Sequence, residues 1–417
     1  MVIMNGTYML SEPRSGYRWC ILALATITGT FVSAVPFSCM PVLFKEISDD
    51  LGLDLVQIGA VWGIASLAGV FVSIAAGVLS DKLGVKLMLS FFCIMVGITG
   101  ALRGLSGSFL TLSFTVFLNG VVRLVVPITV SKTIGIWFRG RNLGLAMGVG
   151  AMGMGFGLML GPMISATVVS PALGGWRNVM YLYGAISALV GVLWAFFGRE
   201  PDRADLMAPV STGVPLRQAL AKLLRLKSLW LIGLTLLFRV GGLMGMTGYL
   251  PLYLRNRGWA EAAADGTLAA FYGISTLCVV PLSFLSDRLG SRKVILYPAL
   301  VVTIFCVGLL PYVDGAVVWT LMLLAGIFMD SFMSLMTTML LETEGVGPAY
   351  SGIALGIGFT IIHVGSVSAP PLGNSLASIN DGAPFLFWAA LTVVALALMF
   401  FVRETGRKKF GIPDSSV

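Results

Sequence analysis

Long apolar segments recur along this chain of 417 residues, and each is close to the roughly 20 residues that a helix needs to cross a bilayer. Only 11% of the residues are charged and 57% are hydrophobic, whereas a soluble domain carries about 25% charged residues. The chain is therefore predicted to be an all-α polytopic membrane protein with twelve transmembrane helices. The twelve segments are residues 19–43, 55–80, 86–106, 109–132, 142–170, 177–198, 229–254, 267–286, 293–312, 315–340, 349–377 and 383–402.

The same sequence argues against several kinds of functional site. Its five cysteines have no paired spacing, and His363 is its one histidine, so no metal site is expected. No Gly-Lys dipeptide occurs, which excludes a Walker A loop and an ATP-driven pump on this chain. No nucleophile and base stand in a recognisable pattern. We therefore predict no cofactor, no metal and no enzymatic activity, and expect gradients to drive any transport.

The distribution of charge predicts the orientation in the membrane. If both termini are cytoplasmic, the inside loops hold 20 of the 27 lysines and arginines, and the outside loops hold five: Lys45, Arg103, Arg177, Arg255 and Arg257. By the positive-inside rule, this bias predicts an integral plasma (inner) membrane protein with both termini in the cytoplasm. It also explains the net charge of +8 without a nucleic-acid partner. Arg103 is expected to anchor span three at the outer surface.

One polar interruption divides the chain into two sets of six spans. It covers residues 199–228, and its last part, from Pro215 to Ser228, has leucines with cations between them, typical of a helix on the membrane surface. The predicted organisation is an N-terminal tail, a six-helix bundle, this linker, a second six-helix bundle and a C-terminal tail: residues 1–18, 19–198, 199–228, 229–402 and 403–417.

The two halves are related in sequence. The segment from Gly77 to Lys86 reads Gly-Val-Leu-Ser-Asp-Lys-Leu-Gly-Val-Lys, and the segment from Ser283 to Arg292 reads Ser-Phe-Leu-Ser-Asp-Arg-Leu-Gly-Ser-Arg. Pro162 and Pro370 match at a similar offset. A duplicated six-helix unit is an architecture that transporters use to build a midplane site between two rocking halves.

With these two loops and the duplication, the chain resembles a major facilitator superfamily (MFS) transporter over essentially its full length. The resemblance implies two pseudo-symmetric six-helix bundles, alternating access, and a cavity lined by spans one, four, seven and ten. It also implies a gating role for nine loop residues: Gly77, Asp81, Lys82, Gly84, Lys86, Asp287, Arg288, Gly290 and Arg292. The run from Trp137 to Gly148 is similar to the loop before span five in anion-symporter and monocarboxylate-porter branches.

Four ionisable side chains fall near the centres of spans: Arg123, Arg239, Asp330 and His363. Three charges facing lipid would cost on the order of 10 kcal/mol, so these groups are expected to point into protein or a wet cavity. An offset of 207 residues relates Arg123 to Asp330, which places them at equivalent positions of the two halves. Asn119 lies one turn from Arg123, on the same helical face.

One acid cannot neutralise two arginines, so at least one guanidinium is expected to lack a fixed partner. Either arginine could instead pair with Asp330 and join the halves. We predict Arg239 as the unpaired arginine that binds an anion, together with Arg123, Asn119 and Tyr249. Asp330 is predicted to carry protons; His363 is either a second coupling group or a packing residue.

These arguments predict a proton-coupled transporter of a small organic anion, most simply a monocarboxylate, that works as a monomer in the bilayer. Its partners are then the anion and protons. The alternative is a proton antiporter that exports drugs or amphipathic metabolites, which the content of methionine and aromatic residues favours. A cationic substrate would need spare acids in the cavity, and Asp330 is the one acid predicted there.

Overall fold

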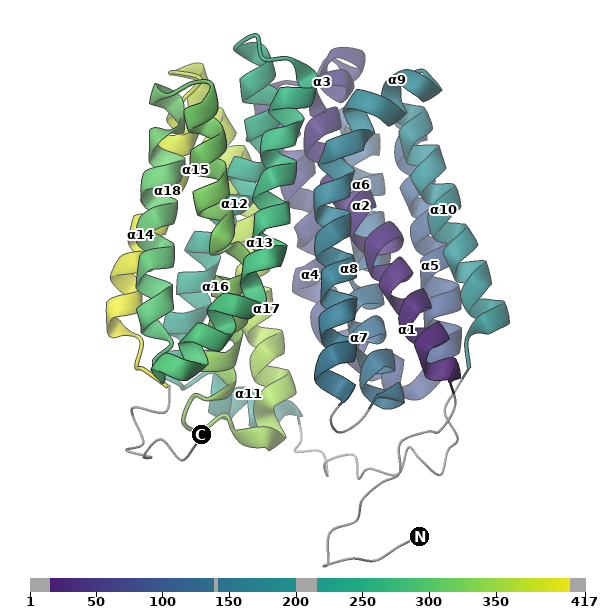
Figure 1. Cartoon of the computed structure of the whole chain (residues 1–417), viewed down its shortest axis with the longest axis vertical. Coiled ribbons are helices and arrows are strands. Elements are labelled where there is room, and N and C mark those ends of the chain that lie inside the picture. The colour runs from purple at the N-terminus through teal and green to yellow at the C-terminus, as the bar shows by residue number, and fades with distance from the viewer. Residues whose placement is uncertain (1–15, 139–141, 200–215, 406–417) are drawn as a thin grey trace, which may run out of the picture.

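The computed structural model describes residues 16–138, 142–199 and 216–405; the side chains of 73–83, 216, 217, 219, 348 and 349 lie outside this description. All regular structure in the described residues is helical, and twelve of its helices are long and apolar enough to cross a membrane. The predicted twelve-span, all-α architecture is thereby confirmed. Figure 1 shows the two sets of six spans lying side by side.

The N-terminal half is built from spans one to six. Its elements are α1 (Tyr17–Thr28), a π-helical stretch (Gly29–Ala34), α2 (Val35–Ser38), α3 (Met40–Leu51), α4 (Leu55–Leu83), α5 (Val85–Leu102), a 3-10 turn (Arg103–Leu105), α6 (Phe109–Arg123), α7 (Val125–Trp137), α8 (Leu143–Ile164), a second π-helical stretch (Ser165–Val169), α9 (Ser170–Leu173) and α10 (Trp176–Phe197). Several spans are thus interrupted rather than uniform helices.

The C-terminal half is built from spans seven to twelve. Its elements are α12 (Lys227–Asn256), α13 (Glu261–Leu289), α14 (Lys293–Leu309), a 3-10 turn (Leu310–Tyr312), α15 (Ala316–Ile327), α16 (Met329–Leu341), α17 (Gly347–Ser375), a 3-10 turn (Leu376–Ser378) and α18 (Ala383–Phe401). Before it lies the short helix α11 (Leu216–Leu223), whose Leu223 is fully buried in this half. Its predicted place on the membrane surface stays a prediction.

Two spans are interrupted beside a charged residue, for different reasons. In span four, α6 ends at Arg123 because Pro127 has no N–H to donate to the carbonyl four residues earlier. In span ten, α15 ends at Ile327 and α16 begins at Met329. There the N–H of Asp330 donates to Oγ of Ser275 on α13 at 3.1 Å. Interrupted helices at mid-membrane depth are where many transporters place their sites.

The halves meet along two helix pairs, α4 with α17 and α8 with α13. Small residues allow the close approach: a Cβ atom on Gly63 of α4 would lie 2.4 Å from the carbonyl oxygen of Val367 on α17. A Cβ on Gly155 of α8 would lie 2.1 Å from Oγ1 of Thr276 on α13. Glycines at such positions permit helix packing that any larger side chain would prevent.

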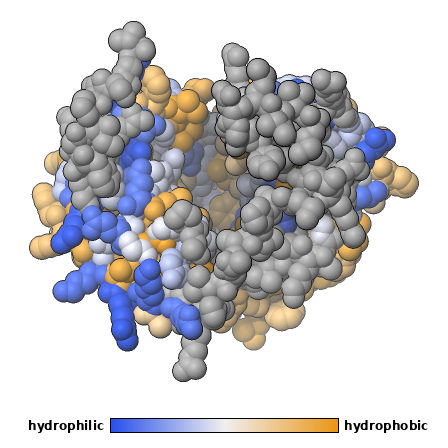
Figure 2. All heavy atoms as spheres, turned by 90° about the horizontal axis from the view of Figure 1, so that it is seen from below, coloured by the Kyte–Doolittle hydropathy of each residue, from blue (hydrophilic) through white to orange (hydrophobic). Residues whose placement is uncertain are grey.

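We call the face at which α1 begins and α18 ends the inner face, and the opposite face the outer face. Hydrogen bonds join the halves in the outer part: Nε1 of Trp62 donates to the carbonyl of Met244 at 2.7 Å, and Nδ2 of Asn374 donates to the carbonyl of Leu55 at 2.7 Å. Figure 2 shows the inner face hollowed between the halves. The structure is therefore closed at the outer face and open toward the inner face.

Candidate functional site

Arg123 ends α6 near the middle of span four and points toward span one. Its guanidinium carbon lies 4.5 Å from the centre of the Phe37 ring. Within the described part of the chain, Arg123 has no hydrogen bond and no ion pair, and its side chain is partly exposed. A cation over an aromatic face is stabilised by about 0.5–2 kcal/mol, which leaves all five guanidinium N–H groups available to a ligand.

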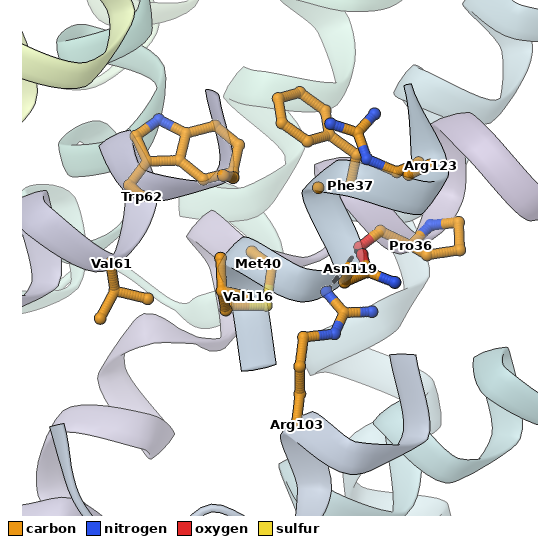
Figure 3. Close-up of a pocket in the computed structure, with 11 residues that line it drawn as sticks. Pro36, Phe37, Met40, Val61, Trp62, Arg103, Val116, Asn119 and Arg123 are labelled. Atoms are coloured by element: carbon orange, nitrogen blue, oxygen red, sulfur yellow. Dashed lines mark hydrogen bonds between the residues drawn. The ribbon is translucent and has the colours of Figure 1, made fainter. Parts of the chain in front are cut away.

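Arg123 borders a cavity between spans one, two, three and four of the N-terminal half (Figure 3). The volume is about 20 Å³, enough for roughly one water molecule in this conformation. No acidic residue is among those that line it: Pro36, Phe37, Met40, Val61, Trp62, Ala65, Arg103, Val116, Asn119, Gly120 and Arg123. The cavity therefore holds two cationic groups and no protein anion, an environment suited to a negative ligand.

Arg103 is the second cation of this cavity, and its predicted role as a surface anchor is wrong. Its side chain is only 3% exposed. Nε donates to the carbonyl of Gly100 at 3.2 Å, and Nη1 donates to the carbonyl of Pro36 at 3.2 Å. Pro36 lies in a span that π-helical and proline-containing turns make irregular. Arg103 folds back from the end of α5 because this irregular span offers it a buried carbonyl.

Aromatic side chains form one wall of the cavity. The Phe37 ring stacks on Trp62 with centroids 4.7 Å apart and planes at 25°, and Phe44 meets Trp62 edge-on. Trp62 is also the donor that binds Met244 of the opposite half. The ring beneath Arg123 therefore touches the residue that holds the outer ends together. Sequence analysis missed this wall because it depends on how two separate spans are rotated toward each other.

Asn119 and Tyr249, two predicted substrate ligands, are engaged by the protein itself. Asn119 is 4% exposed, and its Nδ2 donates to Oγ1 of Thr99 at 3.0 Å and to the carbonyl of Val96 at 3.2 Å. Tyr249 is 2% exposed, and its hydroxyl donates to the carbonyl of Asp381 at 3.2 Å. Contact of either residue with substrate stays a prediction. It would require these hydrogen bonds to protein groups to be replaced by hydrogen bonds to the substrate.

Arg239 lies inside the C-terminal half rather than beside the cavity. Its side chain is 1% exposed, Nη2 donates to Oγ1 of Thr303 at 3.3 Å, and its guanidinium carbon lies 4.5 Å from the centre of the Phe332 ring. Nε has no hydrogen-bond partner among the described residues. Of the two mid-membrane arginines, Arg123 is thus the one that a ligand can reach in this conformation.

Asp330 accepts a hydrogen bond from Oγ of Ser275 at 2.6 Å and is partly exposed. In the described part of the chain, neither Arg123 nor Arg239 comes within ion-pair distance of its carboxylate. The predicted pairing of an arginine with Asp330 is therefore not made in this state. Asp330 instead has a neutral hydrogen-bond partner on a neighbouring span.

His363 lies at the contact between the two halves. It belongs to α17 and packs on Gly69 of α4, where an added Cβ would lie 2.2 Å from its ring. No hydrogen bond joins the imidazole to another described residue. His363 is also close enough to Arg123 for the two to interact electrostatically. A proton on this ring would therefore be felt at the arginine that borders the cavity.

The loop after α13 forms an ion network. Arg292 pairs with Asp287 of the same loop and with Glu342 at the end of α16, the latter at 3.1 Å. Burial alone would lower the pKa of Arg292, but its bonds to Glu342 and Asp287 outweigh this and raise it. Arg288 lies with its guanidinium carbon 4.6 Å from the centre of the Phe284 ring. Gly290 supplies the left-handed turn, with φ of 64°.

The equivalent loop of the N-terminal half turns at Gly84, which has φ of 79°. Lys86 lies in the first turn of α5. The description leaves out the side chains of residues 73–83. The predicted gating role of Gly77, Asp81 and Lys82 therefore stays a prediction.

The sequence matches a known family and several known transporters. The sequence model of the Major Facilitator Superfamily matches residues 26–361 and 268–415. A probable nitrate/nitrite antiporter of Thermus thermophilus is 26% identical over 72% of this chain and 68% of its own length. The 4-hydroxybenzoate transporter of Pseudomonas aeruginosa is 24% identical over 94% and 93%. A multidrug resistance protein of Proteus mirabilis is 26% identical over 89% and 92%.

Among solved structures, a bacterial homologue of the human lysosomal transporter Spinster, in an inward-facing and occupied conformation, has a TM-score of 0.77. It is 15% identical in sequence, and the match covers 94% of this chain and 97% of that chain. At this identity the likeness shows the fold alone.

Proposed function

Because the chain belongs to the Major Facilitator Superfamily, we propose that it is a secondary transporter that carries a small organic anion together with protons. The chain is an integral membrane protein and not an enzyme. The observation that carries the proposal is the partly exposed guanidinium of Arg123, which has no hydrogen bond or ion pair among the described residues, at a cavity with a second arginine and no acid among its lining residues. The relatives named for nitrate or nitrite and for 4-hydroxybenzoate support an anionic substrate.

A monocarboxylate is the simplest substrate that fits Arg123. A guanidinium presents a planar fork of N–H donors, which matches the two oxygens of one carboxylate. The partly exposed ring of Phe37 beside it offers an apolar surface for the organic part of the anion. Arg239, Asn119 and Tyr249 remain proposed ligands at other stages of the cycle, when their present protein partners have exchanged.

For proton coupling we propose Asp330, with His363 as a second group. Asp330 has a serine rather than an arginine as its hydrogen-bond partner, so its charge is not fixed by an ion pair. A carboxyl group in the membrane interior marks proton pathways in many transporters. His363 lies at the moving contact between the halves, where its exposure changes as they rock. Protonation there would alter the repulsion felt by Arg123.

We further propose that the protein acts as a monomer in the plasma (inner) membrane with both termini cytoplasmic. The bias of lysines and arginines toward the inner loops supports this orientation. The hollow face then opens to the cytoplasm, and the nine loop residues of the two gating motifs lie beside it. The ion network of Asp287, Arg292 and Glu342 is the part of this gate that the described side chains form.

The test is uptake into proteoliposomes under an imposed pH gradient, with carboxylates, inorganic anions and cationic dyes compared. We expect carboxylate uptake that an inward proton gradient accelerates and a protonophore abolishes. A second candidate is export of amphipathic drugs by proton antiport, which the likeness to a multidrug resistance protein favours. Uptake of the dyes alone, driven by the opposite proton gradient, would favour that candidate and contradict the first.

A further inference from the structure

A second cavity lies at the inner face of the C-terminal half, where α12 begins and α16 and α18 end. Its volume is about 370 Å³, far larger than the cavity beside Arg123. Ten described residues line it: Leu226, Lys227, Ser228, Leu231, Ile232, Thr343, Glu344, Phe401, Arg403 and Thr405. None of them belongs to the proposed transport site, so the cavity needs its own explanation.

Two cations of this cavity have no partner among the residues that the structure describes. Lys227 and Arg403 are exposed, and neither makes an ion pair or side-chain hydrogen bond with a described residue. Glu344 is the one acid among the ten, and it already takes part in another interaction. The first turn of the 30-residue helix α12 also borders the cavity, and no side chain caps it. Two free cations and the positive end of a helix dipole favour an anion.

The same cavity has an apolar side. Leu231, Ile232 and Phe401 contribute to its wall, and Phe401 is 72% exposed. Trp230, next to the wall, donates from Nε1 to the carbonyl of Leu224 at 2.8 Å and is 41% exposed. Tryptophan side chains are enriched at the depth of lipid headgroups in membrane proteins. Cationic and apolar side chains in the wall of one cavity match the two parts of a phospholipid.

Hydrogen bonds join Thr405, which lines this second cavity, to the loop after α13. Oγ1 of Thr405 donates to Glu342 at 2.7 Å, and Glu342 accepts from Arg292 at 3.1 Å. Glu404, next to Thr405, accepts from the backbone N–H of Arg292 at 3.0 Å and of Lys293 at 3.1 Å. A ligand that orders the segment 402–405 therefore acts directly on the ion network of that loop.

We propose that this cavity binds the phosphate of an anionic phospholipid in the inner leaflet, and that the bound lipid stabilises the inward-open arrangement through residues 402–405. A free phosphate would use the same cations, hydroxyls and helix end. The exposed Phe401 and the apolar wall favour the lipid. The site is independent of the proposed substrate, because it shares no residue with the cavity beside Arg123.

The experiment measures thermal unfolding of the purified full chain in neutral detergent, titrated with dioctanoyl phosphatidylglycerol, dioctanoyl phosphatidylcholine or inorganic phosphate. We expect phosphatidylglycerol to raise the Tm, and neither other probe to do so at the same concentration. In Lys227→Gln/Arg403→Gln the apparent Kd for phosphatidylglycerol should rise about 30-fold, taking roughly 1 kcal/mol for each cation. A control with the same loss of charge, Lys45→Gln/Arg225→Gln, should bind as the unaltered chain does.

Three further variants keep the result decisive if the double variant does not fold. Each single change should raise the apparent Kd about fivefold, and Lys227→Arg/Arg403→Lys should restore binding because it keeps both charges. Stabilisation by inorganic phosphate to the same extent would overturn the lipid in favour of a free anion. Equal affinity in the double variant and its control, or no Tm shift with phosphatidylglycerol, would overturn the site itself.

Discussion

The mid-membrane charged residues differ in whether they have hydrogen-bond partners among the described residues. Arg239 is enclosed with Thr303 and Phe332, and Asp330 is bonded to Ser275, whereas Arg123 meets only the face of Phe37 among the described residues. Sequence reasoning favoured Arg239 as the arginine that binds substrate. The geometry favours Arg123, because its guanidinium makes no hydrogen bond or ion pair with a described residue that a ligand would have to replace.

This difference predicts unequal effects of two matched substitutions. Arg123→Gln should lower kcat/KM for carboxylate uptake by about 10–100-fold, because it removes a charge-assisted pair worth roughly 1.5–3 kcal/mol. Arg239→Gln should lower it less than about fivefold, since that side chain does not border the cavity. Initial rates in proteoliposomes at several substrate concentrations measure both values. Equal losses in the two variants would mean that Arg239 contributes to substrate binding as much as Arg123 does.

Asp330 should be needed for coupling rather than for binding. In Asp330→Asn we expect exchange of labelled for unlabelled carboxylate to continue, because Arg123 is intact. Uptake driven by a pH gradient should fall at least tenfold, since the amide cannot carry a proton. Both assays use one preparation of proteoliposomes, so protein quality is controlled internally. Loss of exchange and uptake together would show that Asp330 holds the site in shape instead.

His363 should set the pH dependence of transport. When protonated, its ring repels Arg123, so His363→Gln should flatten the change in uptake rate with pH, compared between about pH 4 and pH 8. Rates measured across that range at constant proton gradient test this. A profile identical to that of the unaltered chain would leave His363 as a packing residue on Gly69.

At the element scale, the outer closure depends on α4 and α12 meeting through one tryptophan. A Cβ atom on Gly248 of α12 would lie 2.3 Å from Cδ1 of Trp62. Nε1 of the same tryptophan donates to the carbonyl of Met244. Since Phe37 stacks on this indole, the closure and the wall of the Arg123 cavity are one connected set of rings. An anion too large for the present cavity therefore has to move a ring that holds the outer ends together.

The closure predicts that Gly248→Ala separates the outer ends. Leu252, one turn farther along α12, is 3% exposed and would become accessible. In a chain whose five cysteines are replaced, Leu252→Cys should react several-fold faster with a membrane-impermeant thiol reagent when Gly248→Ala is present. Gly107→Ala is the control, because nothing lies within 4 Å of a Cβ added there. An unchanged labelling rate would mean that the Trp62 contact does not govern closure.

The interrupted spans show where prediction from sequence reached its limit. Long apolar segments predict where each span lies, because length and hydropathy are local properties of the chain. Pro127 was visible in the sequence, yet its effect on Arg123 follows only when span four is built as a helix. The interruption of span ten has no local cause: the N–H of Asp330 turns to Ser275, 55 residues away.

At the scale of the whole molecule, the duplication and the loop motifs were enough to predict the family and its fold. The duplication and the loop motifs could not predict the contacts of Arg103 and Trp62. The first turns inward to a carbonyl of span one, and the second crosses to the opposite half. Both depend on contacts between spans that are far apart in sequence, and on the inward-open state that the chain adopts here.

The central claim is that Arg123 holds the substrate anion. The most direct measurement is the binding affinity of the best-transported carboxylate for the purified protein, by titration calorimetry. We expect Arg123→Gln to raise Kd about 10–100-fold, and Arg225→Gln, which removes an exposed arginine of the inner face, to leave Kd unchanged. Equal affinity of the unaltered chain and Arg123→Gln would contradict it.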